Sequence, residues 1–238
     1  MNGVIAGISY RALLGRRRIW LLVMLPAVLV ALAGLLRYFG GPSERIAVAL
    51  METFAIGTML PLLGLIAGTG VIGPEIDDGT IVHLLSKPIA RPVIAQTKFA
   101  VAASMLAVFA AVPTLVAAYL LIGFESGVAL GFTVGALAGG IAYAAVFMLL
   151  GVLTRHAVTV GIVYALIWEG VVGGFVPGAQ KYSIQYWARS IADQLSSSAF
   201  LSTEVTVGFA VPALVVVTVG AVVWAGQRLR SFSLTGDE

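Results

Sequence analysis

The chain has 238 residues, of which 60% are hydrophobic and 11% are charged, and its mean hydropathy is +1.03. This balance excludes an ordinary soluble protein, because a chain of this length cannot hide so much apolar surface from water. The absence of cysteine excludes disulfides and thiolate metal sites. The formal net charge of +3 is small, so the placement of the charges is more informative than their sum.

The first 18 residues predict a helix that lies on the membrane surface. Apolar Val4, Ile5, Ile8 and Ala12 recur at helical spacing, and a basic run at residues 16–18 follows them. An amphipathic helix with basic residues beside its apolar face is typical of the membrane interface. The alternative is a frayed basic tail.

Six apolar runs follow, each near the length of about 20 residues that a helix needs to cross the hydrocarbon core. They predict an all-α integral membrane protein with six transmembrane helices, and no linker or repeat divides residues 1–238 into more than one domain. The predicted spans are 19–36, 46–72, 99–122, 128–153, 157–176 and 205–225.

The charges then orient these spans. With six spans both termini lie on one side, and if that side is cytoplasmic, ten of the 14 Lys and Arg residues lie inside and four outside. This obeys the positive-inside rule, so we expect the segment 73–98 in the cytoplasm and the segment 177–204 outside. The ten inner residues are Arg11, Arg16, Arg17, Arg18, Lys87, Arg91, Lys98, Arg155, Arg228 and Arg230, and the outer ones are Arg37, Arg45, Lys181 and Arg189.

The outer segment predicts an amphipathic helix of its own. After a break at Pro177 and Gly178, the stretch 183–195 places Ile184, Trp187, Ile191 and Leu195 on one helical face. Such a face, with aromatic residues near the headgroups, is expected to sit on or dip into the outer leaflet.

Glycines at four-residue spacing predict close contacts between helices. Small residues at this spacing let helix backbones approach each other where lipid offers no hydrophobic driving force. We expect these contacts inside one subunit rather than between subunits. The pairs and triplets are Gly131, Gly135 and Gly139; Gly64 and Gly68; and Gly170 and Gly174.

Two acids, Glu52 and Glu169, interrupt the predicted spans, both roughly 10 Å below the outer boundary. Ionisable groups at such depth often mark transport routes, so one hypothesis is a polar patch at the outer mouth of a translocation path. The alternative is structural: each carboxyl is protonated or is satisfied by Arg45, Lys181, Arg189 or a tyrosine hydroxyl.

The stretch GPEIDDGTIVHLLSKPIAR, residues 73–91, joins two of the apolar runs, is expected in the cytoplasm, and is rich in charged residues. Its order of acids, Gly-Thr, an apolar cluster and Ser-Lys-Pro predicts a short amphipathic helix with a capped start and a proline-marked end. Such an element suits docking onto a soluble partner.

Enzyme signatures are missing from the sequence. A phosphate-binding loop needs a Gly-Lys pair, and the chain contains none. His83 and His156 lie on different loops, and the acids at 75, 77 and 78 form one cluster without the second that a diphosphate-binding magnesium site needs. Basic patches with interleaved aromatics are missing, which excludes nucleic acid. The nearly uniform apolar spans favour a transporter subunit over a channel.

With these features in place, the chain resembles the ABC type-2 exporter permeases. The resemblance rests on an amphipathic helix before the first span, the six-span order, the cytoplasmic stretch quoted above, and YALIWEGVVGGFVPG at residues 164–178. It covers nearly the whole length.

The resemblance implies that the cytoplasmic stretch is a coupling helix that sits in a groove of a separate ATPase. Acidic residues would begin the helix, because the positive end of the helix dipole favours negative charge there. A cluster of apolar residues would follow and contact the ATPase. Basic residues would anchor the end of the helix near the membrane. The alternative is an amphipathic loop held to lipid headgroups. The coupling residues implied are Glu75, Asp78, Gly79, Thr80, Ile81, Leu84, Leu85, Lys87, Pro88 and Arg91.

It further implies a non-catalytic subunit in a bacterial plasma membrane, without a cofactor of its own. The partners implied are membrane lipid, a dimer of ABC ATPase subunits that carries ATP and Mg, and a second permease copy or a sister permease. The compact outer segment favours lipid-like or drug-like cargo. Two other classes remain: a membrane scaffold or assembly factor, and an ion-coupled carrier with Glu52 and Glu169 as proton sites.

Overall fold

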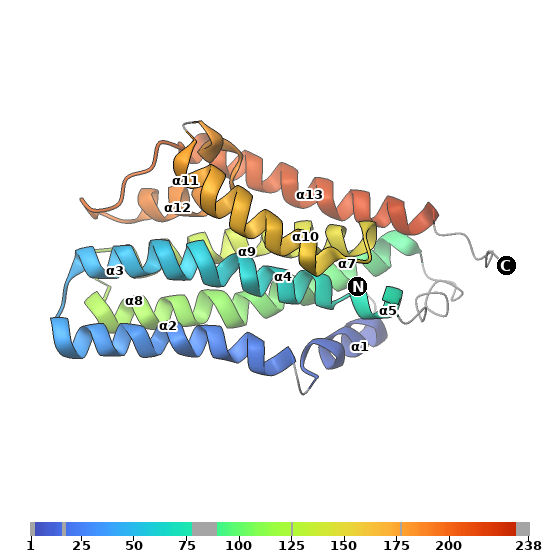
Figure 1. Ribbon diagram of the computed structural model, residues 1–238, viewed down its shortest axis with the longest axis horizontal. Coiled ribbons are helices and arrows are strands. Elements are labelled where there is room, and N and C mark those ends of the chain that lie inside the picture. Colours follow the sequence, from blue (N-terminus) through green and yellow to red (C-terminus); the bar gives the residue numbers. More distant parts are fainter. Residues whose placement is uncertain (1–2, 16–17, 78–89, 125, 177, 232–238) are drawn as a thin grey trace.

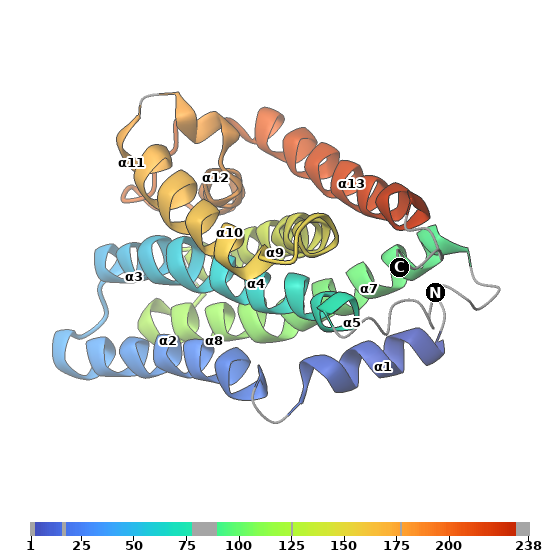
Figure 2. The same ribbon diagram turned by 45° about the vertical axis from the view of Figure 1, so that its right-hand side comes forward.

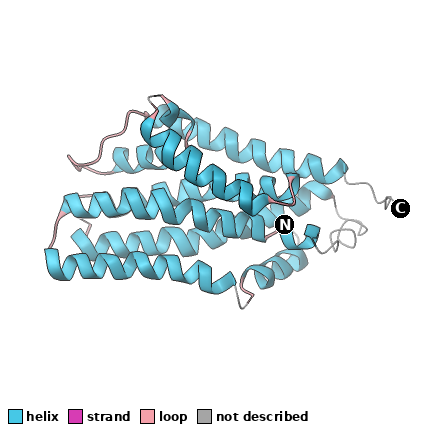
Figure 3. Ribbon diagram, in the orientation of Figure 1, coloured by secondary structure: helices cyan, strands magenta, loops and turns pink. Residues whose placement is uncertain are grey.

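The computed structural model describes residues 3–15, 18–77, 90–124, 126–176 and 178–231, and these residues form helices joined by loops, without a strand (Figure 3). The predicted all-α fold is confirmed. Within the described residues, five helices are long and apolar enough to cross a membrane, while Ala157–Val172 is a shorter apolar helix. The sixth span therefore stays a prediction. The five helices are Ile19–Gly40, Glu44–Ile76, Arg91–Ile122, Val128–Leu153 and Val207–Leu229.

Several of these apolar helices consist of consecutive helical segments. The second joins α3, η1, α4 and α5, the third joins α7, η2 and α8, and the shorter apolar helix joins α10 and η3. The bounds are α1 Gly3–Leu13, α2 Arg18–Gly40, α3 Glu44–Leu50, η1 Met51–Met59, α4 Leu60–Gly70, α5 Gly73–Asp77, α7 Arg91–Leu106, η2 Ala107–Ala111, α8 Val112–Ile122, α9 Val128–Leu153, α10 Ala157–Val163, η3 Tyr164–Val172, α11 Gly173–Phe175, η4 Ala179–Tyr182, α12 Ile184–Leu195 and α13 Val207–Ser231.

Two of the π-helical segments, η1 and η2, are explained by proline. Pro61 and Pro113 each lie two residues after such a segment ends. Proline has no N–H to donate and its ring crowds the carbonyl one turn earlier, so a wider turn before it keeps the helix continuous. The Thr114 hydroxyl donates to the Ala110 carbonyl at 2.7 Å and satisfies one acceptor there. Both spans therefore continue through their prolines.

Helix α9 is the centre of the bundle and packs against α4, α7, α8, α12 and α13 (Figure 2). Glycines permit the close approach of α9 to α12 and to α4. A Cβ added to Gly135 would lie 2.4 Å from the Ala188 carbonyl oxygen of α12, and one added to Gly64 of α4 would lie 2.6 Å from Cβ of Tyr143. The predicted close packing inside one subunit is confirmed for these two glycine series. Gly174, by contrast, faces open space within the described chain.

The two ends of the bundle carry different elements (Figure 1). Helices α1 and α5 and the last turns of α13 lie at one end, and α12 lies towards the other. Helix α1 buries Ile5 and Leu13, leaves Val4 and Ile8 exposed, and is tied to α7 by a hydrogen bond of 2.7 Å between the hydroxyls of Tyr10 and Ser104. Its predicted helical structure is confirmed, and its place on a membrane surface stays a prediction.

Helix α12 corrects the expectation for the outer segment. The helix exists at almost the predicted bounds, with Ser183 as its N-cap. Its apolar face, however, packs into this protein: Ile184, Trp187 and Ile191 are buried, and α12 lies against α9 and α13. The expectation that this face meets lipid was wrong, because the glycine series on α9 offers it a closer surface. Leu195, at the end of the face, is exposed.

Candidate functional site

Most of the implied coupling helix lies outside the described residues. The structure does place the two residues that flank it, Glu75 in α5 and Arg91 at the start of α7. The implied coupling residues outside the described ranges are Asp78, Gly79, Thr80, Ile81, Leu84, Leu85, Lys87 and Pro88.

The entry to this segment is held by a buried lysine. Lys98 Nζ donates to Glu75 Oε1 at 2.7 Å and to the Val71 carbonyl oxygen at 2.5 Å, and the Lys98 side chain has no exposed surface. Glu75 is largely covered as well, with 20% of its side chain exposed. Removing one partner of such a buried pair typically costs about 3–5 kcal/mol, because the other charge is left without compensation. The entry is thereby fixed to α7.

The exit of the segment is fixed to α13. Arg91 Nη1 donates to the Leu229 carbonyl oxygen at 3.0 Å, near the end of α13. Pro92 packs beside Gly226 of the same helix, where an added Cβ would lie 3.4 Å from the proline Cα. The described residues on both sides of 78–89 are thus anchored to the bundle.

Sequence reasoning missed the role of Lys98. The sequence predicts that Lys98 is a cytoplasmic loop residue, because the apolar run begins at Phe99. The helix begins at Arg91 instead, and Lys98 lies two turns inside it. The available signal was Pro92, which suits the first turn of a helix. Glu75 lies in α5, and its role at the start of a coupling helix and towards a partner stays a prediction.

The second candidate site is Glu169, which is fully buried in η3. One carboxylate oxygen accepts from the Tyr164 hydroxyl at 2.8 Å and from the Ile184 N–H at 3.1 Å. The other accepts from the Ser183 hydroxyl and from the Gln185 N–H at 3.4 Å. The side-chain amide of Gln185 donates in return to the Glu169 carbonyl at 3.4 Å.

This arrangement caps helix α12 with a carboxylate from another helix. The first backbone N–H groups of a helix have no partner within it, and the positive end of its dipole favours an anion. Four donors use the roughly four acceptor positions that a carboxylate offers. Of the two hypotheses for Glu169, the geometry therefore favours the structural one. The partners are a tyrosine hydroxyl, as proposed, and the start of α12.

Glu52 also contacts α12, but it does so through its backbone carbonyl and not through its carboxylate. Arg189 Nη2 donates to the Glu52 carbonyl oxygen at 3.0 Å, and the guanidinium carbon lies 4.9 Å from the centre of the Tyr186 ring. The Glu52 side chain is half-buried in η1. Both acids are thus near α12: Glu169 contacts it at Gln185, and Glu52 contacts it at Arg189, one helical turn further along. Their carboxylates have different surroundings, and a role in a substrate path stays a prediction.

Comparison with known families gives one finding. A family model described as ABC-2 family transporter protein matches residues 14–178, which is more than half of the chain. The match runs from the end of α1 to the turn before η4, and so includes Glu52, Glu75, Lys98 and Glu169, whereas α12 and α13 lie beyond it. No curated protein matches the chain. Together with the five long apolar helices, the match makes the chain a multi-pass membrane protein.

Proposed function

Because the chain belongs to the ABC-2 family of transporter proteins, we propose that it is the permease subunit of an ATP-driven exporter. The family model that covers residues 14–178 is the observation that carries this proposal. The cargo is an amphipathic, lipid-like or drug-like molecule that leaves the cell. The energy comes from a separate ATPase, and this chain contributes no catalysis.

The partner is a dimer of ABC ATPase subunits, which holds ATP and Mg. Residues 78–89 dock into it as a coupling helix, with Ile81, Leu84 and Leu85 as the apolar contact and Asp78 towards basic groups of the partner. Two permeases pair above the ATPases, as a homodimer or with a sister permease. The termini face the cytoplasm of a bacterial cell.

The anchored ends of the coupling segment support a mechanical role. Lys98 joins the entry to α7, and Arg91 joins the exit to the end of α13. A push on the segment by the ATPase is therefore shared among α4, α7 and α13 instead of bending a free loop. At the opposite end, Glu169 and the glycines of α9 fix α12 to the bundle. The bundle then moves as rigid bodies, and packed cores favour such discrete rearrangements.

Everted membrane vesicles test the exporter against the ion-coupled carrier. The chain is co-expressed with its ATPase partner, and uptake of a fluorescent cationic amphiphile into the vesicle lumen is followed. We expect uptake that requires ATP and continues when the pH gradient is collapsed with an ionophore. Glu52→Gln should leave this ATP dependence in place, as should Glu204→Gln, an exposed-acid control.

Uptake that is driven by a pH gradient without ATP would contradict the exporter proposal. If that uptake were lost in Glu52→Gln but not in Glu204→Gln, the result would support the ion-coupled carrier.

A further inference from the structure

A cluster of polar groups lies inside the apolar bundle, where α9, η1 and η3 meet α12. It consists of Tyr143 on α9, Glu169 on η3, Gln185 and Arg189 on α12, and the Glu52 carbonyl on η1, and we call it the polar core. Within the described chain, three of its atoms are buried and have no hydrogen-bond partner: the Tyr143 hydroxyl, Gln185 Oε1 and Arg189 Nε. Buried polar atoms almost always have a partner in the protein or in ordered water, so these three atoms require one.

Gln185 and Arg189 face a common point beside η1. A Cβ added to Gly57 would lie 3.6 Å from Gln185 Oε1 and 3.5 Å from Arg189 Nη2. The orientation of the Gln185 amide is fixed, because its Nε2 donates to the Glu169 carbonyl at 3.4 Å and its oxygen then lies on the other side of the amide group. Tyr143 interacts electrostatically with both Glu169 and Arg189. The three unpartnered atoms therefore belong to one connected cluster.

The groups that adjoin these atoms are already engaged. The Glu169 carboxylate accepts from four donors, which uses the roughly four acceptor positions that it offers. Arg189 Nη2 donates to the Glu52 carbonyl, and Gln185 Nε2 donates to the Glu169 carbonyl. Two donors, the Tyr143 hydroxyl and Arg189 Nε–H, and one acceptor, Gln185 Oε1, are left.

Water is the ligand whose chemistry matches this set. A buried water typically makes about three hydrogen bonds to groups that would otherwise be unsatisfied, and it both accepts and donates. A cation would meet the Arg189 charge and a single remaining acceptor. An anion would meet the Glu169 carboxylate and the Gln185 oxygen. A small neutral molecule avoids both conflicts.

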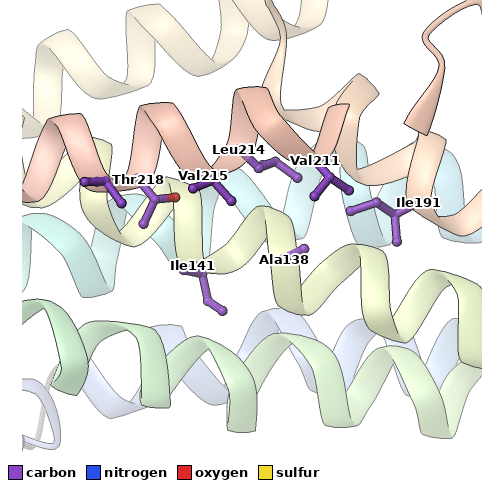
Figure 4. Close-up of a pocket in the computed structure, with 8 residues that line it drawn as sticks. Ala138, Ile141, Ile191, Val211, Leu214, Val215 and Thr218 are labelled. Atoms are coloured by element: carbon purple, nitrogen blue, oxygen red, sulfur yellow. The ribbon is translucent and has the colours of Figure 1, made fainter. Parts of the chain in front are cut away.

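The opposite side of α12 shows a different kind of site. Ile191 lies two residues after Arg189, which places it about 200° around the helix. It lines an apolar groove of about 310 Å³ between α9 and α13 (Figure 4). Thr218 supplies the one polar side chain among the residues that line this groove, so water has too few partners to be held there. Of these two sites, the polar core is the one that offers what a buried water needs.

We propose that the polar core binds ordered water, which accepts from the Tyr143 hydroxyl and from Arg189 Nε–H and donates to Gln185 Oε1. The water completes a hydrogen-bonded network that joins α9, η1 and η3 to α12 inside the bundle. This binding belongs to the chain itself and does not depend on the cargo, the direction or the energy source of transport.

X-ray radiolytic footprinting of the full chain in mild detergent tests this proposal. The X-ray pulse produces hydroxyl radicals from bound water, and these oxidise the neighbouring side chains even where bulk water does not reach. Mass spectrometry then locates the oxidised residues. We expect Tyr143 to be oxidised at least about fivefold faster than Phe132, an aromatic residue of the same helix that is equally buried. Equal rates for the two residues would overturn the proposal.

Gln185→Leu replaces the acceptor with an apolar side chain and should slow the oxidation of Tyr143 at least about threefold. Gln194→Leu, at an exposed position of the same helix, is the matched control and should leave this rate unchanged. Equal rates of Tyr143 oxidation in the two variants would show that water is not held at Gln185, and the site as proposed would be wrong.

Tyr143→Phe is an independent thermal test, because it keeps the ring and removes only the hydroxyl. Loss of a hydroxyl that is hydrogen-bonded to water should lower the melting temperature by about 2–4 °C, whereas removal of an unpartnered buried hydroxyl should raise it. Tyr182→Phe, at a side chain that is 67% exposed, is the control and should melt like wild type. A raised melting temperature in Tyr143→Phe would contradict the proposal. A lowered one, without oxidation of Tyr143 in the wild-type chain, would overturn it by assigning the hydroxyl to Glu169 directly.

Discussion

Glu169 shows how one side chain determines the position of a whole helix. A carboxylate within an apolar bundle is costly unless its acceptors are satisfied, and here the four donors all come from this chain. Two of them are backbone N–H groups at the start of α12, which would otherwise be buried without partners. The acid and the helix start thus satisfy each other.

Glu169→Gln is therefore expected to destabilise the protein. The substitution places an amide NH₂ group where the site offers only donors, which costs about 3 kcal/mol and lowers the melting temperature in mild detergent by about 6–12 °C. Ser183→Ala removes the N-cap hydroxyl and should cost about 1 kcal/mol. Glu204→Gln is the exposed control and should melt like wild type. A Glu169→Gln protein that melts like wild type but transports a different cargo would restore the substrate-path hypothesis.

The Lys98 and Glu75 pair is the second residue-scale prediction. Lys98→Met and Glu75→Gln should each destabilise the protein by about 3 kcal/mol, because each leaves its buried partner uncompensated. The double variant should cost at least 1 kcal/mol less than the sum, since contacting residues are energetically coupled. Thermal melts of the four proteins give the cycle, with exposed Lys181→Met as the control. Strict additivity would show that the ion pair does not hold the segment entry.

At this scale the sequence was enough to identify the important acid in the apolar runs. It was not enough to identify most of the groups that this acid binds. An acid in an apolar run stands out, so Glu169 was found, and a tyrosine hydroxyl was among its expected partners. Its main partners, Ser183 to Gln185, come from a helix whose position the sequence does not give. Lys98 was misplaced because a charged residue near the end of an apolar run has the same local pattern in a loop as in a helix.

At the scale of elements, the contact between α9 and α12 organises the end of the bundle opposite α1. Gly131 and Gly135 let α12 approach so closely that an added Cβ would lie 2.6 and 2.4 Å from the carbonyl oxygens of Ala192 and Ala188. These are backbone atoms, so the clash cannot be relieved by moving a flexible side chain. The packing of α12 therefore depends on the absence of side chains on this face of α9.

Gly135→Ala should consequently separate the two helices. We expect a loss of about 1–3 kcal/mol from overpacking, measured as a lower melting temperature. Gly220→Ala is the matched control: it lies in α13 with no heavy atom within 4 Å of the added Cβ, and alanine there should stabilise the helix by up to about 1 kcal/mol. If both variants melted alike, close approach would not be what holds α12.

The amphipathic pattern of 183–195 correctly predicted a helix, but it did not predict what the apolar face of this helix contacts. A periodic apolar face requires an apolar contact, and in this chain both lipid and α9 satisfy that requirement. The glycine series on α9 and the apolar face of α12 were both visible in the sequence, yet nothing local pairs one with the other. Only the folded arrangement decides between a lipid-facing and a protein-facing helix.

At the scale of the whole molecule, the described ends agree with one orientation. Helix α1, α5 and the end of α13 share one end of the bundle, and α12 lies towards the other (Figure 1). This is the arrangement expected from an even number of crossings. The charge bias predicts that the α1 end faces the cytoplasm. Composition and apolar run lengths were enough to predict the helical membrane fold, because both follow directly from lipid as the solvent.

Cysteine labelling tests this orientation without a background, since the chain contains no cysteine. A membrane-impermeant maleimide should label Ser197→Cys, near the end of α12, in intact cells. It should label Ser86→Cys, in the segment that we predict to be cytoplasmic, only after permeabilisation. The reverse pattern would invert the topology, and labelling of both from outside would contradict the odd number of crossings, three, that we predict between them.

The central claim is that this chain works with a separate ATPase, and affinity purification tests it most directly. The tagged chain is purified in mild detergent from its own cells and its partners are identified by mass spectrometry. We predict a stoichiometric soluble subunit with a phosphate-binding Gly-x4-Gly-Lys-Ser/Thr loop, retained by Gly220→Trp and lost in Gly79→Trp, whose bulk would block the coupling contact. Recovery of the wild-type chain alone, under conditions that preserve a known transporter complex, would contradict the account and favour the scaffold or the carrier.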